Sequence, residues 1–584
     1  MTLVNRGLDE WRAEIPLAEN ARVLFAVRAW TDLYGSWLAD LKKRVEGGAA
    51  DVSNEVCEGV RLIAEAGRRA KGVDRNILDN AAAELKDAAK DPRLALETAS
   101  RSVTVDLMAL WEEKRDAVAS RPELEITVDR PLARFGAWYE LFVRSQGTAP
   151  GKSGTFRDAE ARLPDIRDMG FDVVYLAPIH PIGRTGRKGR NNSLAAGPAD
   201  PGSPWAIGNE SGGHTAIEPS LGSMADFERF VKKTRALGME VALDFALQCS
   251  PDHPWVKEHP EWFYRRPDGS VKYAENPPKK YEDIYPLNFD SGRPRALWEE
   301  VRRTLLFWIE RGVTIFRVDN PHAKPLAFWQ WLIRDIQTGH PEVFFLAEAF
   351  TRPPMMRALA KAGFSQSYTY FTWRNTKPEL TGYLTELAGS DMAEYFRPNF
   401  FTNTPDILPP VLQTGGRPAF MARAALAATL SPSWGIYSGF ELCENEAVPG
   451  KEEYLNSEKY EIKLRDWNGR GNVKDWIRRL NKIRRENLCL SRLDTLAFLE
   501  TDNDQVLFYE KCLPDRSSPL WIAVSLDPSK KQECLLNPPK DPAGTDFTAR
   551  ELISETTHAW NGPCRFVIEP SRPALIFRAQ RKPS

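Results

Sequence analysis

The sequence has little that suits a secreted, membrane-spanning or nucleic-acid-binding protein. No uncharged apolar run reaches the roughly 18 residues that a membrane helix needs, and Asp9, Glu10 and Glu14 stand where a secretory signal would need an apolar core. The seven cysteines contain no CxxC pair and are odd in number, which argues against a disulfide framework. Lys and Arg total 79 against 80 Asp and Glu. This balance does not favour nucleic acid or an anionic membrane as partner, and we expect a cytoplasmic protein.

The sequence also lacks the common signatures of cofactor sites. It contains no phosphate-binding P-loop, no GxGxxG fingerprint and no His/Cys cluster with metal-ligand spacing. We find no acidic cluster that predicts a calcium site. We therefore expect no cofactor and no metal.

The pattern of apolar residues divides the chain into four parts. Residues 21–31 alternate like a strand, and residues 37–118 are rich in Ala, Leu, Glu, Lys and Arg with helical spacing. Farther along, strand and helix patterns alternate, and Gly170, Gly238 and Gly312 follow three helices where a left-handed cap is needed. After about residue 492 only short β runs remain, separated by Pro, Asp, Asn and Gly.

These patterns predict a multidomain α/β fold with a central (β/α)8 TIM barrel at residues 135–491. We expect a short β segment within residues 1–36 and a helical domain at residues 37–118. Residues 492–584 should form a C-terminal antiparallel β-sandwich.

Four acidic residues each follow a short β run in the middle of the chain: Asp244, Asp319, Glu348 and Asp406. Their spacing suits successive βα units, and the catalytic side chains of such a barrel lie at the C-terminal ends of its strands. Glycoside chemistry needs two carboxyl groups that flank a sugar anomeric carbon. The four residues therefore predict an enzyme that acts on glycosidic bonds.

Two long segments, residues 178–217 and 250–290, are expected to cover this site, because connections beyond about 15 residues are usually functional loops. Both mix aromatic residues with Lys, Arg and Asn, which suits a ligand with sugar faces, hydroxyls and an anionic group. For the segment GRTGRKGRNN, the alternative interpretation that it is a solvated basic loop without a ligand remains open. For His214, a site residue and a packed loop residue are equally compatible with the sequence.

The segments DFALQ, FRVDNPH, FLAEAF and FFTNTPD resemble the four signature regions of the α-amylase clan, glycoside hydrolase family 13. The longer segments ENPPKKYEDIYPLNF, GSPWAIG with GGH, and GIYSGFELCEN followed by PGKEEYLNSEKYEI resemble the GlgE family of α-1,4-glucan:maltose-1-phosphate maltosyltransferases. Gln248-Cys249 and Pro405-Asp406 depart from the wider clan, which usually has Asn-His and His-Asp there, but are similar to the GlgE pattern. The resemblance covers roughly residues 20–584.

The resemblance implies an activity in glycogen and α-glucan metabolism. Maltosyl units would pass from the donor α-maltose 1-phosphate to the non-reducing end of an α-1,4-glucan acceptor, with inorganic phosphate as product. In a retaining double displacement, Asp319 would be the nucleophile, Glu348 the general acid and base, and Asp406 a ligand of the distorted ring's hydroxyls. Arg317, two residues before Asp319, would keep the nucleophile ionised, and Asp244 would support Arg317 or be purely structural.

The same resemblance implies further substrate-binding positions. The maltosyl unit would contact Lys188, Ser203 and Gln248. The phosphate or reducing end would contact Asn276, Lys279, Tyr281 and Asn320, and His322 would bind a sugar hydroxyl.

Two alternative functions remain open from the sequence. One is an α-glucan hydrolase or transglycosylase that does not use phosphate, against which Lys279 and the NPPKKY segment argue. The other is a non-catalytic glucan-binding scaffold, against which the intact catalytic carboxylates argue.

GlgE proteins generally dimerise through a full N-terminal β-sandwich and the helical segment. Only about 36 residues precede the helical stretch here. The resemblance therefore implies a truncated N-terminal β-sandwich at residues 1–36, completed by about 119–134, with the helical domain beside it. We expect the contact of a homodimer to be weakened or moved to the helices.

Overall fold

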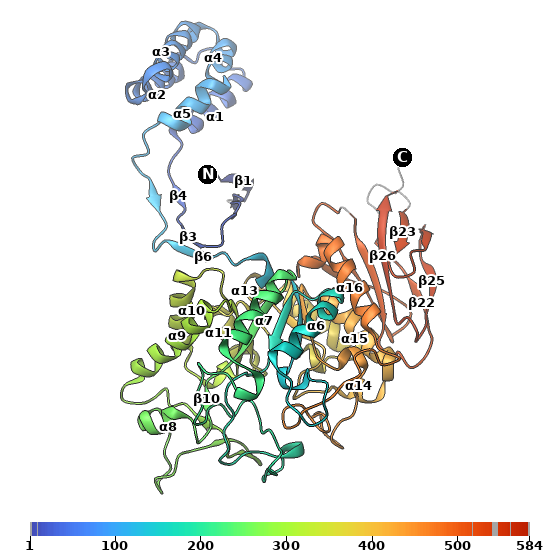
Figure 1. Cartoon of the computed structure of the whole chain (residues 1–584). Coiled ribbons are helices and arrows are strands. Elements are labelled where there is room, and N and C mark those ends of the chain that lie inside the picture. Colours follow the sequence, from blue (N-terminus) through green and yellow to red (C-terminus); the bar gives the residue numbers. More distant parts are fainter. Residues whose placement is uncertain (1–2, 9, 517, 540–546, 561, 582–584) are drawn as a thin grey trace. The chain divides into compact units, whose positions relative to one another are not determined.

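The structure is a computed structural model in which two compact units are described separately. One unit is residues 22–128, and the other combines residues 1–21 with 129–584 (Figure 1). The described residues are 3–8, 10–516, 518–539, 547–560 and 562–581. Within these residues, no helix has both the length and the apolarity to cross a membrane.

The smaller unit contains the helical domain. Its helices are α1 (Leu33–Glu46), α2 (Ser53–Arg69), α3 (Gly72–Asp87), α4 (Pro92–Ala99) and α5 (Ser102–Trp111). They pack around buried Trp37, Leu41, Ile63 and Leu78. A β-carbon on Gly59 of α2 would lie 2.0 Å from the Trp37 ring, so this glycine lets the first two helices approach closely.

The N-terminal strands form two-stranded ribbons. In the smaller unit, β3 (Arg22–Phe25) pairs with β6 (Leu124–Thr127), and β4 (Arg28–Ala29) pairs with β5 (Val118–Ala119). In the larger unit, β1 (Val4–Gly7) pairs with β2 (Glu10–Arg12). Apolar side chains of the β3–β6 ribbon are exposed, among them Leu24 at 58% and Leu124 at 48%.

The larger unit is built on the predicted eight-stranded parallel barrel. Its strands are β7 (Gly136–Leu141), β8 (Val173–Leu176), β9 (Glu240–Ala246), β14 (Ile315–Asp319), β15 (Phe344–Glu348), β16 (Gln366–Ser367), β17 (Asn399–Phe401) and β18 (Ser433–Tyr437). They follow the spatial order β16-β15-β14-β9-β8-β7-β18-β17. Ser367 of β16 bridges to Pro398 in parallel, and its N–H donates to the carbonyl of Arg397 at 3.0 Å. This contact joins the two end strands and closes the barrel.

Helices surround the barrel (Figure 1). The longer ones are α6 (Phe156–Asp168), α7 (Met224–Ala236), α9 (Pro294–Glu310), α10 (Leu326–Gly339), α11 (Pro353–Lys361), α12 (Lys377–Gly389), α15 (Gly416–Leu430) and α16 (Lys474–Glu486). Positive φ angles at Gly170 (88°), Gly238 (76°) and Gly312 (90°) confirm the predicted left-handed helix caps.

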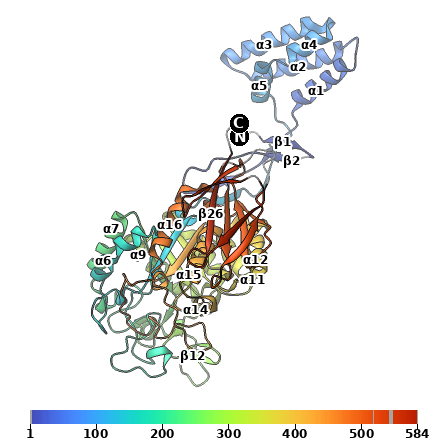
Figure 2. The same ribbon diagram turned by 90° about the vertical axis from the view of Figure 1, so that its right-hand side faces the viewer.

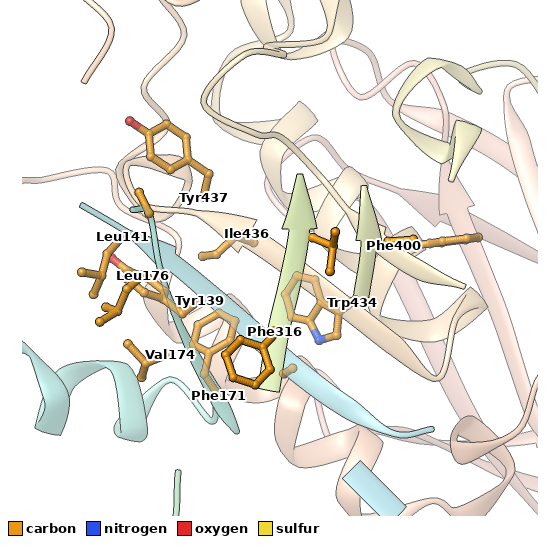
Figure 3. Close-up of a cluster of buried hydrophobic side chains, with 14 of the residues drawn as sticks. Tyr139, Leu141, Phe171, Val174, Leu176, Phe316, Phe400, Trp434, Ile436 and Tyr437 are labelled. Carbon is orange, nitrogen blue, oxygen red and sulfur yellow. The ribbon is translucent and has the colours of Figure 1, made fainter. Parts of the chain in front are cut away.

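Alternate residues of the barrel strands serve two cores. Tyr139, Val174, Phe316 and Trp434 belong to the cluster of strand and helix side chains shown in part in Figure 3. The intervening residues belong to a second cluster, which includes Trp138, Tyr175, Ile315, Phe344 and Leu346. Because strand side chains alternate in direction, Arg317 and Asp319 share the face of Ile315 and not that of Phe316. The fold thereby directs these two charged residues toward the barrel interior.

The C-terminal region forms two packed sheets (Figure 2). The six-stranded sheet contains β19 (Leu496–Leu499), β20 (Val506–Lys511), β21 (Leu520–Ser525), β26 (Ala574–Arg581), β23 (Phe547–Glu551) and β24 (Thr557–Trp560), in that order. The second sheet pairs β22 (Gln532–Leu536) with β25 (Cys564–Ile568). Both contribute to one core that includes Trp521, Cys534, Ile568 and Phe577, as expected for the predicted antiparallel sandwich.

Candidate active site

The ends of three neighbouring barrel strands bring the predicted acidic residues together. Asp319 and Glu348 are the last residues of β14 and β15 and are direct partners in the strand register. Arg317 of β14 is the register partner of Asp244 of β9. Asp406 follows β17 in a turn. The site therefore lies at the C-terminal end of the barrel, where the fold usually places catalytic side chains.

The guanidinium of Arg317 connects three of these carboxyl groups. Its Nη1 donates to Asp319 Oδ1 and to Asp244 Oδ2, each at 2.9 Å. Its Nη2 lies 3.0 Å from Glu348 Oε1. Tyr175 also donates its hydroxyl to Asp244, so Asp244 contacts two groups that orient it. Arg317 is only 5% exposed, and its charge therefore acts with little screening by water.

The surroundings shift the pKa values of Asp319 and Glu348 in opposite directions. Burial tends to raise the pKa of Asp319, but the charges of Arg317 and Lys324 outweigh it and hold the pKa below its usual value. Burial raises the pKa of Glu348 to about 8; the Arg317 charge opposes this rise, and Asp319 reinforces it. At neutral pH Asp319 is ionised and Glu348 carries a proton. This is the division needed for a nucleophile and a general acid.

Asp406 forms an ion pair with a lysine that was not predicted as a site residue from the sequence. Lys459 Nζ lies 2.8 and 3.0 Å from the two carboxylate oxygens of Asp406. The same ammonium lies 5.0 Å from the ring centre of Trp205. The local signal was present, because Lys459 lies in the segment EEYLNSEKYEI, but only the fold shows its contact with Asp406.

Lys324 is a second residue near the site that was not predicted from the sequence. Its ammonium donates to the carbonyl of Asn320 at 3.1 Å and lies 3.5 Å from that of Asp319. Asn320 itself donates its side-chain amide to Asp319 Oδ2 at 3.2 Å and its N–H to Glu348 Oε2 at 3.3 Å. Its φ of 45° lies in the left-handed region, which asparagine tolerates better than most residues. Asn320 thereby contacts both catalytic candidates.

The predicted maltosyl-binding residues come from the first long loop and the end of β9. Lys188 and Ser203 are buried, at 1% and 3% exposure. Gln248 begins the short strand β10 (Gln248–Cys249) and donates to the carbonyl of Trp205 at 3.3 Å. Lys188 Nζ has no hydrogen-bond partner among the described residues. A buried, unsatisfied ammonium is costly, so this group suits a ligand rich in hydroxyls.

The second loop carries the other predicted substrate residues on a hairpin. Asn276 ends β11 (Ala274–Asn276), and Lys279 and Tyr281 begin and end β12 (Lys279–Tyr281). Asn276 and Lys279 are exposed, and among the described residues no hydrogen bond or ion pair joins either of them to Asp319 or Glu348. Lys279 instead forms an ion pair with Glu453. His322 is half-buried, and burial followed by the Lys324 charge lowers its pKa.

The side chains of one buried group of His and Cys residues lie as close together as the ligands of a metal ion would. Candidate ligand atoms of His214, Cys249 and His253 lie within 4.8 Å of one another. However, Trp255 N–H donates to His253 Nδ1 at 3.1 Å, so the proton of His253 is on Nε2, which lies 3.1 Å from His214 Nδ1. His214 Nε2 then donates to the carbonyl of Ala246 at 2.9 Å. The ring nitrogens are thus used in a neutral hydrogen-bonded chain, and we assign His214 to packing of the loop.

Comparison with known proteins identifies relatives over nearly the whole chain. Residues 1–130 match the family model described as "Alpha-1,4-glucan:maltose-1-phosphate maltosyltransferase, domain N/S", and residues 140–324 match "Alpha amylase, catalytic domain". The chain is 52% identical to the α-1,4-glucan:maltose-1-phosphate maltosyltransferase of Rhodospirillum rubrum, over 99% of the chain and 85% of the relative. It is 49% identical to the enzyme of that name from Myxococcus xanthus, over 98% of the chain and 87% of the relative.

Solved structures support the fold independently. An α-amylase from Lactobacillus plantarum matches with a TM-score of 0.60 and 20% identity, over 77% of this chain and all of that one. An α-amylase from Geobacillus thermoleovorans matches with a TM-score of 0.61 and 16% identity, over 78% of this chain and all of that one. At these identities the likeness concerns the fold, which is that of the α-amylases.

Proposed function

Because the chain belongs to the α-1,4-glucan:maltose-1-phosphate maltosyltransferase family, we propose that it transfers maltosyl units from α-maltose 1-phosphate to the non-reducing ends of α-1,4-glucans. Inorganic phosphate is the second product. The observation that carries the chemistry is the shared contact of Asp319 and Glu348 with Arg317, together with the opposite shifts of their pKa values.

In the first half of the reaction, the ionised carboxylate of Asp319 attacks the anomeric carbon of the donor. The bond from that carbon to the phosphate oxygen breaks, and Glu348 gives its proton to the departing oxygen. The product is a β-linked maltosyl ester of Asp319. Arg317 and Asn320 hold the attacking carboxylate in position through their contacts with Oδ1 and Oδ2.

In the second half, the ionised Glu348 takes the proton of an acceptor hydroxyl. The acceptor oxygen bonds to the anomeric carbon, and the ester bond to Asp319 breaks. Each displacement inverts the anomeric carbon, so the two steps together restore the α configuration. The N–H of Asn320, 3.3 Å from Glu348 Oε2, favours the ionised form required in this step.

The remaining residues are proposed to bind the substrates. Asp406, oriented by Lys459, would bind hydroxyls of the reacting ring, and Lys188, Ser203, Gln248 and His322 would bind the maltosyl unit. Asn276, Lys279, Tyr281 and Asn320 would bind the phosphate or reducing end. Lys279 suits this role because a phosphate monoester carries about −1.5 to −2 charge near neutral pH.

We also propose the cytoplasm as the compartment and a homodimer as the assembly. All seven cysteines are free thiols, which suits a reducing environment. Exposed apolar residues of the helices, among them Leu94 of α4 and Leu110 of α5, offer surface for a second copy. Light scattering after size exclusion tests the assembly. A concentration-independent mass near twice 66.0 kDa supports the dimer, and a mass of 66.0 kDa at all concentrations contradicts it.

Incubation of the purified protein with α-maltose 1-phosphate and glycogen tests the activity. Release of phosphate in step with growth of the glucan supports the proposed transfer. Shortening of the glucan without dependence on phosphate would indicate a hydrolase or transglycosylase instead. Binding of glycogen without either change would indicate a scaffold. The Asp319→Ala variant is the matched control, because it lacks only the attacking carboxylate.

A further inference from the structure

Glu453 connects the hairpin that bears Lys279 to a loop far away in the sequence. Its Oε1 pairs with the ammonium of Lys279, and its Oε2 lies 3.7 Å from Nζ of Lys451. One carboxylate thus lies between two ammonium groups. Resting on the proposed function, we propose that Glu453 is an internal counterion that exchanges with phosphate at Lys279 and Lys451 and promotes release of the phosphate product.

The loop holds Glu453 in place through its backbone and its neighbour. Val448 N–H donates to the carbonyl of Glu453 at 2.8 Å, and Ala447 and Tyr454 form an antiparallel bridge. The adjacent Glu452 accepts a hydrogen bond from Trp373 Nε1 at 2.9 Å. These contacts fix the backbone on both sides of Glu453. Its side chain is therefore presented to Lys279 by an ordered loop.

The ion pairs of Glu453 with Lys279 and Lys451 are partly exposed, so an anionic ligand can compete with the Glu453 carboxylate. The side chains of Lys279, Glu453 and Lys451 are 43%, 33% and 56% exposed. Exposed ion pairs of this kind are weak, whereas a phosphate brings more charge and three acceptor oxygens to the same two cations. A bound phosphate therefore displaces the Glu453 carboxylate. When the phosphate departs, the carboxylate returns and neutralises both ammonium groups.

The negative charge of Asp406 also acts on Lys279, since it is among the groups that raise the pKa of this lysine. The main cause of that rise in pKa is the hydrogen bond to Glu453 itself. Lys279 is therefore fully charged whether Glu453 or phosphate is its partner. Exchange between the two anions needs no change in its protonation.

Glu453→Gln tests the exchange, with inorganic phosphate as the probe. At constant ionic strength, the inhibition constant of inorganic phosphate should fall by about two- to fivefold, the range expected from an exposed ion pair. Glu446→Gln is the matched control, because Glu446 is an exposed residue of the same loop without an ion pair in the described chain. It makes the same change of charge and should leave the inhibition constant unchanged. An equal fall in both variants would indicate a general charge effect and contradict the exchange.

Lys279→Ala and Lys451→Ala complete the test. Each should weaken inhibition by phosphate, and in the Lys279→Ala background the added Glu453→Gln change should lose most of its effect. If Glu453→Gln still lowers the inhibition constant to the full extent in that background, Glu453 and phosphate do not share Lys279. An unchanged inhibition constant in Lys451→Ala would likewise contradict the shared site. The wild-type protein distinguishes failure of the proposed function from failure of the counterion role. If it releases no phosphate from α-maltose 1-phosphate, the proposed function fails; if it does, but Glu453→Gln leaves phosphate inhibition unchanged, only the counterion role fails.

Discussion

Asp319 and Glu348 are joined by a single guanidinium, since Arg317 reaches one carboxylate through Nη1 at 2.9 Å and the other through Nη2 at 3.0 Å. The two acids nevertheless have pKa values shifted in opposite directions. Lys324 adds positive charge near Asp319, whereas Asp319 and Asp406 add negative charge near Glu348. The distinct roles that we propose for them therefore follow from their electrostatic environments and not from their residue types.

Asp319→Ala should lower maltosyl transfer by at least about ten-thousandfold, because no other side chain can form the covalent ester. The fold should persist, since Arg317 keeps Asp244 and Glu348 as partners. Phosphate release and circular dichroism of the purified variant measure the two effects. Asp504→Ala, a substitution of a fully exposed side chain, is the control. Full activity in Asp319→Ala would remove Asp319 from the role of nucleophile.

The pH dependence should report the protonation of Glu348. Its pKa, raised to about 8, makes the proton available below that pH and unavailable above it. The kcat/KM for α-maltose 1-phosphate should therefore fall by about three- to tenfold between pH 8 and 9, a range in which the donor phosphate keeps its charge. In Glu348→Gln this alkaline decline should disappear. A decline of the same size in the variant would assign it to another group.

The barrel and its acidic residues were predictable because they depend on local patterns. Alternating strand and helix patterns, helix-ending glycines and acids after strands are properties of short segments, and the structure places Asp244, Asp319 and Glu348 at the ends of neighbouring strands. The contact of Lys459 with Asp406 and that of Glu453 with Lys279 were not predicted. Each joins segments more than fifty residues apart, and no local periodicity specifies such a pair.

The buried histidines are a further case in which a contact between distant segments could not be predicted from the sequence. His214 was left open between site and packing, and its hydrogen bond to His253 decides for packing. The sequence offers no indication that His214 and His253 meet, because the two lie in different long loops. The register of the N-terminal strands likewise could not be predicted from their pattern, since short alternating runs predict a strand but not its register.

Lys279→Ala should raise the KM for α-maltose 1-phosphate by about ten- to a hundredfold, the cost of losing a charge-assisted hydrogen bond of about 1.5–3 kcal/mol. Binding of a neutral malto-oligosaccharide should change much less. Lys280→Ala is the matched control, because alternate strand residues point to opposite faces of the hairpin. Equal losses for charged and neutral ligands would place Lys279 outside the phosphate site.

Three buried histidines should make the stability of the larger unit sensitive to acid. Burial lowers the pKa of His180 to about 4, of His214 to about 3 and of His253 to about 2. Between pH 6.5 and 4.5 the unfolded chain therefore binds more protons than the folded one, and the free energy of unfolding falls as the pH falls. Each histidine contributes up to about 1.4 kcal/mol per pH unit while the pH lies well below its unfolded pKa and above its folded pKa.

Urea unfolding of the full chain at several pH values measures this dependence. His180→Gln should reduce the slope of stability against pH by about 1.4 kcal/mol per pH unit, because one titrating group is removed. His340→Gln, a change at the partly exposed end of α10, serves as control. An unchanged slope in His180→Gln would show that protonation of this buried cluster does not limit stability.

Intact-mass spectrometry of Glu348→Ala with α-maltose 1-phosphate, in the presence of glycogen, tests the central mechanism most directly. Phosphate is a good leaving group, so the first displacement should survive in part without the acid, whereas the second lacks its base. We expect release of one phosphate per protein and a mass increase of one maltosyl group, located by peptide mapping at Asp319. Continued phosphate release without any covalent adduct would contradict the double displacement.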